Sequence, residues 1–115
     1  MRRAKVQAVI VVPNGLINSE LKHIVELQMT LRLPLVFGQR SGVDAGGLAS
    51  YGVSTPESYR RVAMYADKIL KGAAPGDLPI EFPNKIELAI NLRTAKALGL
   101  IVPPTLLDRA DVVIE

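Results

Sequence analysis

The stretch that decides the fold is residues 45–72, AGGLASYGVSTPESYRRVAMYADKILKG. Its glycine-rich first part predicts an extended segment over residues 47–51, and its second part predicts an amphipathic helix over residues 55–72. Thr55 is the expected N-cap, Pro56 suits the first helical position, and Gly72 suits the position just past the end. At helical spacing, one face of this helix is apolar: Tyr59, Val62, Ala63, Ala66, Ile69 and Leu70.

Upstream of this stretch, the pattern predicts a strand, a helix and a second strand. Residues 6–12 form a nearly continuous β-branched run, which is typical of a parallel strand covered on both faces. Asn18 or Ser19 can cap a following helix whose inner face carries Leu21, Ile24, Val25, Gln28 and Leu31. Leu33-Pro34 ends that helix, and residues 35–37 are a short buried strand. This order predicts a parallel βαβ unit.

Downstream of Gly72, the elements are shorter. Pro79 and Pro83 interrupt residues 78–84, so a regular strand is expected only from Lys85 to Ile90. Asn91 can cap a helix to Leu98, Pro103-Pro104 opens one more helical turn, and residues 112–114 suit a final strand. Residues 39–44 are a loop or one helical turn. The fold class is α/β.

The amino-acid composition excludes several classes of function. The chain has 115 residues, 49% of them hydrophobic, and a net charge of +3, which suits one globular unit. Its dispersed basic residues and 4% aromatic content do not form the basic, stacking surface of a nucleic-acid groove. The absence of cysteine excludes disulfides and thiolate metal sites. His23 is the only histidine, so no catalytic residue, metal or cofactor is expected. Neither glycine-rich phosphate-binding motif occurs within residues 38–52.

The amino-terminal residues resemble part of a signal peptide. Met1-Arg2-Arg3-Ala4-Lys5 is charged, and residues 6–12 are apolar. The apolar part is short, contains Gln7, and is followed by Pro13-Asn14-Gly15 without a small-x-small cleavage site. We interpret the segment as a buried strand with a signal peptide as the alternative, so localisation is open.

The loop at residues 13–19 is a candidate binding site. Ligands of open α/β sheets bind beyond the carboxyl ends of the strands, where amides and helix starts are exposed. Asn14, Asn18 or Ser19 could hydrogen-bond a carboxylate there. The alternative is a turn followed by an ordinary N-cap.

Several short motifs, in this order, resemble the carboxy-terminal part of the tryptophan/tyrosine-type solute-binding proteins of ABC importers. The matching pieces are LPLVFG (33–38), VDAGGL (43–48), SYG (50–52), YRR (59–61), DKILKG (67–72), DLP (77–79), NL (91–92), TAKALGL (94–100) and PPTLL (103–107). These pieces are spread over residues 33–107 of the chain.

This resemblance implies a partial periplasmic-binding-protein-like fold. Residues 5–51 and 85–115 would belong to the second of two lobes, and residues 53–82 to the first. The implied solute is an amino acid, which could be aromatic, the implied partner is a membrane permease, and the implied location is periplasmic or extracellular. The ligand-binding positions carried over are Asn14, Gly15, Leu16, Arg40, Ser50 and Tyr51. Two positions depart from the pattern: Asn14-Gly15 replaces a frequent Asp-Pro pair, and Gly42 replaces a bulky apolar residue.

Length complicates this picture, because complete relatives are about three times longer. Without their first lobe, the apolar face of helix 55–72 has nothing to cover it, which would forfeit on the order of 5 to 10 kcal/mol of burial. We therefore expect self-association or domain swapping through this helix, or a place in a longer product. The alternatives to a solute-binding module are a small oligomeric α/β protein that acts only by assembly, and an enzyme using the strand-end loops, which few titratable candidates favour.

Overall fold

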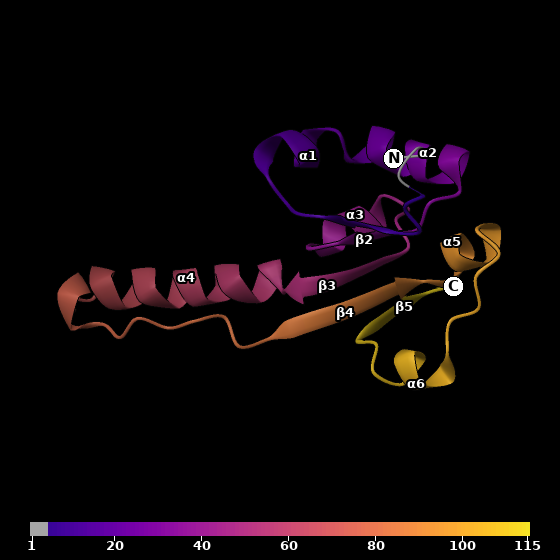
Figure 1. Ribbon diagram of the computed structural model, residues 1–115. Coiled ribbons are helices and arrows are strands. Elements are labelled where there is room, and N and C mark those ends of the chain that lie inside the picture. Colours follow the sequence, from indigo (N-terminus) through magenta and orange to yellow (C-terminus); the bar gives the residue numbers. More distant parts are fainter. Residues whose placement is uncertain (1–4) are drawn as a thin grey trace.

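The computed structural model describes residues 5–115, which form a mixed α/β fold (Figure 1). The strands are β1 (Val9–Val11), β2 (Leu35–Phe37), β3 (Ala49–Val53), β4 (Ile86–Asn91) and β5 (Val112–Ile114). The helices are α1 (Gly15–Ser19), α2 (Leu21–Leu31), α3 (Arg40–Asp44), α4 (Thr55–Leu70), α5 (Leu92–Ala97) and α6 (Pro104–Leu107), and a 3-10 turn, η2, covers Pro75–Asp77. The expected α/β class is confirmed.

The strands form one sheet in the order β1-β2-β3-β4-β5. β1, β2 and β3 are mutually parallel, β4 is antiparallel to β3, and β5 is parallel to β4. The predicted parallel βαβ unit is therefore confirmed. β1 is shorter than the expected residues 6–12, because its partner β2 offers only three residues to pair with. The third strand covers 49–53 rather than 47–51, since β4 supplies five partners to that range.

One face of the sheet carries the core. Val11, Leu35 and Phe37 are buried there against Val25 of α2, and Ile17, Leu21 and Ile24 pack around them. Helices α1 and α2 lie on the same side of the sheet (Figure 1). Gln28, expected on the apolar face of this helix, is buried too, and its amide makes three hydrogen bonds to the backbone of β2 and of residues 46–48.

The other face is largely uncovered, contrary to the two-sided coverage that the β-branched run predicts. Ile10, Val36 and Ala49 are neighbours in the register and so share this face. Tyr51 and Val53 of β3 lie on it as well, because side chains alternate along a strand. Ile10 is 75% exposed and Tyr51 is 61% exposed. The described residues supply a helical layer for only one side of these strands.

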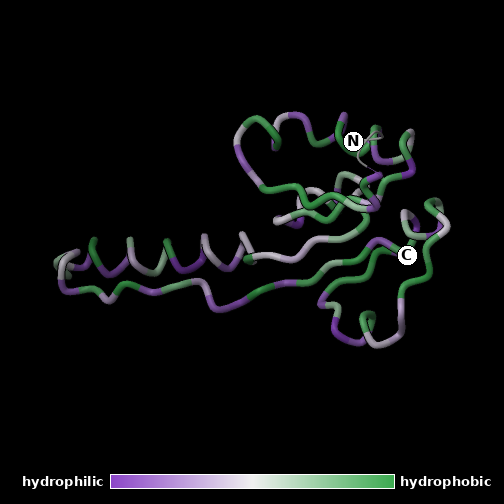
Figure 2. Tube along the Cα trace, viewed as in Figure 1, coloured by the Kyte–Doolittle hydropathy of each residue, from purple (hydrophilic) through white to green (hydrophobic). Residues whose placement is uncertain are grey.

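Helix α4 projects away from the sheet, and residues 71–85 return beside it (Figure 1). We call α4 and residues 71–85 together the arm. None of the residues of α4 is buried, and its turns alternate between apolar and polar side chains (Figure 2). The radius of gyration of 17.6 Å exceeds the ~13 Å of a compact domain of this length. The helix itself is confirmed, as is the expectation that its apolar face is uncovered, as far as residues 5–115 are concerned.

The capping of α4 differs from the prediction. Ser54, not Thr55, is the N-cap residue, which moves Pro56 to the second helical position. Asp67 and Lys71, four residues apart on α4, form an ion pair at 3.0 Å. Glu57 pairs with Arg60, and the Arg61 side chain pairs with Glu81 on the returning segment.

The segment between β1 and α2 also differs. The expected loop contains helix α1, whose N-cap is Asn14: its Oδ1 accepts from the Ile17 N–H over 2.9 Å. The N-cap of α2 is Glu20 rather than Asn18 or Ser19. Both of these residues are inside α1, and the Ser19 hydroxyl donates to the Leu16 carbonyl. Residues 1–4 of the charged start lie outside the described residues.

The carboxy-terminal elements follow the prediction. Asn91 caps α5 through a hydrogen bond from the Thr94 N–H to its Oδ1, over 3.1 Å. Gly99 has a positive φ of 73° just past the end of α5, as a helix-terminating glycine does. Asp111 positions β5, since its carboxylate accepts from the Leu88 N–H while its own N–H donates to the Leu88 carbonyl.

Candidate ligand-binding cleft

An open cleft of about 420 Å³ lies where the three parallel strands end. Pro13 follows β1, Gly38 and Gln39 follow β2, and Val53 ends β3. The first turns of α4 supply the opposite side, with Thr55, Ser58, Tyr59 and Val62. The carboxyl ends of parallel strands are where α/β sheets bind ligands, so this cleft is the leading candidate site.

Two glycines, Gly38 and Gly52, allow the ends of neighbouring strands to approach each other closely beneath the cleft. A Cβ on Gly52 would lie 2.0 Å from the Gly38 carbonyl oxygen, and a Cβ on Gly38 would lie 2.7 Å from Cδ of Pro13. Both distances are far below van der Waals contact, so neither position can carry a side chain unless the strands move. The strand ends therefore pack closely because these residues are glycines.

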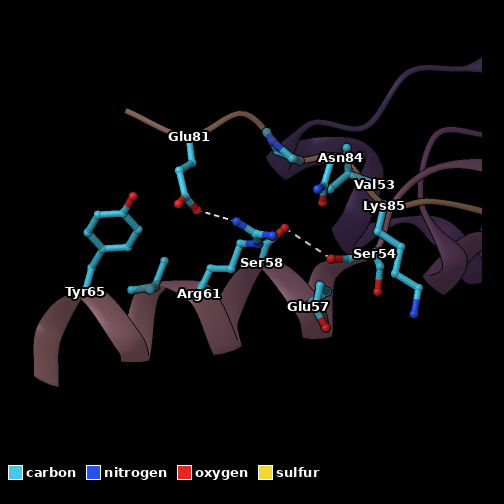
Figure 3. A pocket seen from close by; sticks show the side chains of 11 residues that line it. Val53, Ser54, Glu57, Ser58, Arg61, Tyr65, Glu81, Asn84 and Lys85 are labelled. Atoms are coloured by element: carbon cyan, nitrogen blue, oxygen red, sulfur yellow. Dashed lines mark hydrogen bonds and ion pairs between the residues drawn. The ribbon is translucent and has the colours of Figure 1, made fainter. Parts of the chain in front are cut away.

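A second hollow, of about 220 Å³, lies between α4 and the returning segment (Figure 3). Val53, Ser58 and Val62 line both hollows, so the two are adjacent. Arg61 and Glu81 form an ion pair across it, and the Arg61 Nε is buried without a hydrogen-bond partner among the described residues.

Tyr65 lies at the far end of this second hollow (Figure 3). Its hydroxyl donates to the Pro79 carbonyl over 2.6 Å. Partial burial, followed by the negative charge of Glu81, raises the pKa of Tyr65 above its ordinary value. These contacts hold the returning segment against α4.

The structure places the predicted site residues around the strand-end cleft rather than in its lining. Asn14, Gly15 and Leu16 are the N-cap and first turn of α1, directly after Pro13. The Asn14 Oδ1 is used by the cap, whereas Leu16 is exposed.

Arg40 opens α3, next to Gln39. Its guanidinium already has two carboxylate partners, Asp44 at 3.1 Å and Glu87 at 3.4 Å. Burial lowers the pKa of Arg40, but the hydrogen bonds and charges of Asp44 and Glu87 outweigh this and raise it overall. Arg40 is thus a fixed positive charge that joins α3 to β4.

Ser50 and Tyr51 lie inside β3 and face opposite ways. Ser50 is buried on the covered side of the sheet, next to Phe37 in the register, while Tyr51 is exposed on the uncovered side. Neither of them lines the strand-end cleft.

The lining residues that the sequence reasoning missed come from α4. Thr55, Ser58 and Tyr59 lie in the first turns of a helix that follows a strand without a loop, and this juxtaposition is the signal that could have identified them. Gln39, the first residue of the segment 39–44 that was expected to be a loop or one helical turn, does line the cleft.

The chemistry of the cleft suits binding. The Gln39 amide and the Thr55 and Ser58 hydroxyls can hydrogen-bond a polar solute, and the Tyr59 ring offers an aromatic surface. The lining contains no carboxylate, amine or imidazole. Among residues 5–115 no group of three or more His, Cys, Asp or Glu is placed to hold a metal ion, and no helix is long and apolar enough to cross a bilayer.

Residues 1–114 match the family model described as ABC transporter substrate binding protein. The chain belongs to this family. The tyrosine-binding protein of Clostridioides difficile is 25% identical over 96 residues, which are 84% of this chain and 28% of that protein. The resemblance that the sequence motifs indicated is therefore confirmed.

Solved structures are also similar to this chain. The ABC domain in complex with L-Trp from Streptococcus pneumoniae has a TM-score of 0.88 and 27% identity, covering 98% of this chain and 38% of that one. A conserved domain protein from Vibrio cholerae has a TM-score of 0.85 and 24% identity, covering 93% of this chain and 36% of that one, and shows the fold alone. The chain thus spans between about a quarter and two fifths of the length of these relatives.

Proposed function

We propose that this chain supplies one wall of the solute cleft of an ABC-importer substrate-binding protein. The observation that carries the proposal is the strand-end cleft, whose lining combines hydrogen-bonding groups with one aromatic ring and contains no carboxylate, amine or imidazole. Membership of the substrate-binding family supports it. We infer no catalytic role.

The solute proposed is an amino acid, and an aromatic one fits best. Relatives similar to this chain are a tyrosine-binding protein and a domain in complex with L-Trp. In the proposal, the Tyr59 ring stacks on the solute, while Gln39 and Ser58 hydrogen-bond its polar groups. Asn14, Gly15, Leu16 and Arg40 flank this position, and Ser50 and Tyr51 belong to the strand that leads into the arm.

The partner proposed is an ABC permease, and the location proposed is periplasmic or extracellular, as is typical of the family. We further propose that residues 5–51 and 85–115 correspond to one lobe and residues 53–82 to the other. The projection of the arm from the sheet supports this division (Figure 1). A second wall must then come from another polypeptide segment, because one wall exposes most of a small solute to water.

Thermal melts against a panel of amino acids test the proposal. A solute at ~100 times its dissociation constant should add about 2.7 kcal/mol to the free energy of unfolding. Replacing Tyr59, which is exposed, with alanine should weaken binding about 3- to 10-fold through loss of the aromatic contact. Met64→Ala is the matched control, because Met64 is an exposed residue of the same helix outside the cleft lining.

The chain contains no tryptophan, so the fluorescence anisotropy of L-tryptophan reports its binding without background. Saturable binding that Tyr59→Ala weakens and Met64→Ala does not would support the proposal. A cooperative melt that no amino acid shifts would instead favour the second candidate, an α/β protein that acts only by assembly. The uncovered apolar surfaces of the sheet and of α4 favour that candidate.

A further inference from the structure

The uncovered sheet face is built like a core surface. It is formed by apolar side chains on four adjacent strands: Ile10, Val36, Ala49, Tyr51, Val53 and Ile86. Four of the six are classed as exposed: Ile10, Tyr51, Val53 and Ile86. The strand sequences are apolar on both faces, as in sheets that carry helices on both sides. Ile90, which the register places on the same face, is 2% exposed. Among the described residues, the missing helical layer is therefore the one over β1, β2 and β3.

Helix α4 has the properties of that layer. Its apolar stripe consists of Tyr59, Val62, Ala63, Ala66 and Leu70, all exposed, and Leu70 is 87% exposed. The returning segment packs beside Ser58, Arg61 and Tyr65. Of the stripe, only Val62 borders the same hollow, and it is still 63% exposed. Sixteen residues make a helix ~24 Å long, which is enough to cross five strands spaced ~4.8 Å apart.

We propose that two copies of this chain associate with the α4 stripe of each copy packed on the uncovered sheet face of the other. Within one chain α4 cannot reach that face, because it extends β3 outward and the hydrogen bond from Ser54 N–H to the Lys85 carbonyl ties the base of the arm. A two-fold axis makes the contact reciprocal, so each copy uses both of its bare surfaces at once.

The two surfaces also match in polarity and in size. No charged residue belongs to the stripe or to the six sheet positions, so packing them together buries no unpaired charge. Each copy contributes eleven apolar side chains, eight of them larger than alanine. At roughly 60–120 Å² for each of these eight, the buried area is about 500–1,000 Å² per partner, which brackets the ~800 Å² of a stable complex. The contact deepens the expected self-association through residues 55–72 by naming the surface that receives the helix. Tyr59 and Val62 of the stripe also line the strand-end cleft, so the association needs no solute and competes with solute binding at that cleft.

Sedimentation of the 115-residue chain without any solute tests the association. At about 100 µM, an interface of this size should be occupied, giving a mass of twice 12.4 kDa. Leu70→Asp on the stripe and Ile10→Thr on the sheet face should each weaken dimerisation at least about tenfold. Met64→Asp is the matched control, because Met64 is 60% exposed and lies on the opposite side of α4.

Cross-linking identifies the surface even if a variant folds poorly. The chain has no cysteine, so Ala66→Cys and Val36→Cys chains can be mixed and oxidised. A disulfide-linked pair of one chain of each kind is the expected product. A monomeric wild-type chain, equal effects of Leu70→Asp and Met64→Asp, or no mixed disulfide would each overturn the proposal. Since no solute is present, failure of the solute proposal cannot produce any of these results.

Discussion

Replacing Gln28 with methionine should destabilise the chain far more than a change of similar volume normally does. Gln28 is 1% exposed, and its Oε1 accepts from the Leu35 N–H at 3.1 Å and the Leu48 N–H at 3.3 Å. Methionine fills the same space but accepts neither bond. Each donor left without a partner costs about 1–3 kcal/mol, so the expected loss for two donors is about 2–6 kcal/mol.

Urea unfolding and thermal melts measure this loss. Against a typical total of about 5–15 kcal/mol, it should lower the melting midpoint by roughly 10–25 °C. Lys22→Met is the control, since it places the same side chain at an exposed position of α2 and should change stability by at most ~0.5 kcal/mol. A loss below ~1 kcal/mol for Gln28→Met would refute the reasoning, because water or backbone shifts would then be satisfying both donors.

Two further predictions concern the cleft and the arm. Gly52→Ala should cost about 1–3 kcal/mol of stability in the same melts, because its Cβ would lie 2.0 Å from the Gly38 carbonyl oxygen. Gly76→Ala is the control and should cost far less, because a Cβ on Gly76 would have nothing within 4 Å. Equal losses for the two variants would contradict the close approach of Gly52 to Gly38. The raised pKa of Tyr65 means that its stabilising contribution is complete below the ordinary tyrosine value of 10.0 and is lost as the pH rises through the raised value. Tyr65→Phe should therefore flatten the alkaline fall in stability measured by urea unfolding, and an unchanged fall would show that other groups cause it.

The parts of the fold that were predictable from sequence are those with local causes. Helix α4 has its hydrophobic stripe, its proline start and Gly72 after its end, and α5 has Asn91 at its start; each signal lies within a few residues of the element that it specifies. The N-cap of α4 was misplaced by one residue, because Ser54 and Thr55 are both capping residues. Helix α1 was missed because Asn14-Gly15 after a proline also reads as a turn.

The site was less predictable, because its parts meet only in the folded chain. Tyr59 was predicted only as part of the apolar face of helix 55–72, and it also lines the cleft, since the position of α4 depends on where β3 ends. Arg40 was expected to meet a carboxylate of the solute, and it meets Glu87, which is 47 residues away in sequence. Local patterns carry no information about such pairs. The six residues carried over from the family resemblance therefore remain predictions.

The hydrogen bond from the Ser54 N–H to the Lys85 carbonyl, 3.2 Å long, has a consequence for how this chain can vary. This hydrogen bond continues the pairing of β3 with β4 by one step beyond Val53 and Ile86. The chain therefore leaves the sheet after Ser54 and returns to it at Lys85, directly beside the point where it left. In topology the arm is an insertion into a β-hairpin, and a two-residue turn could join the same strands in the same register. The arm can therefore be shortened, lengthened or exchanged, by evolution or by an experimenter, while every strand of the sheet keeps its neighbours.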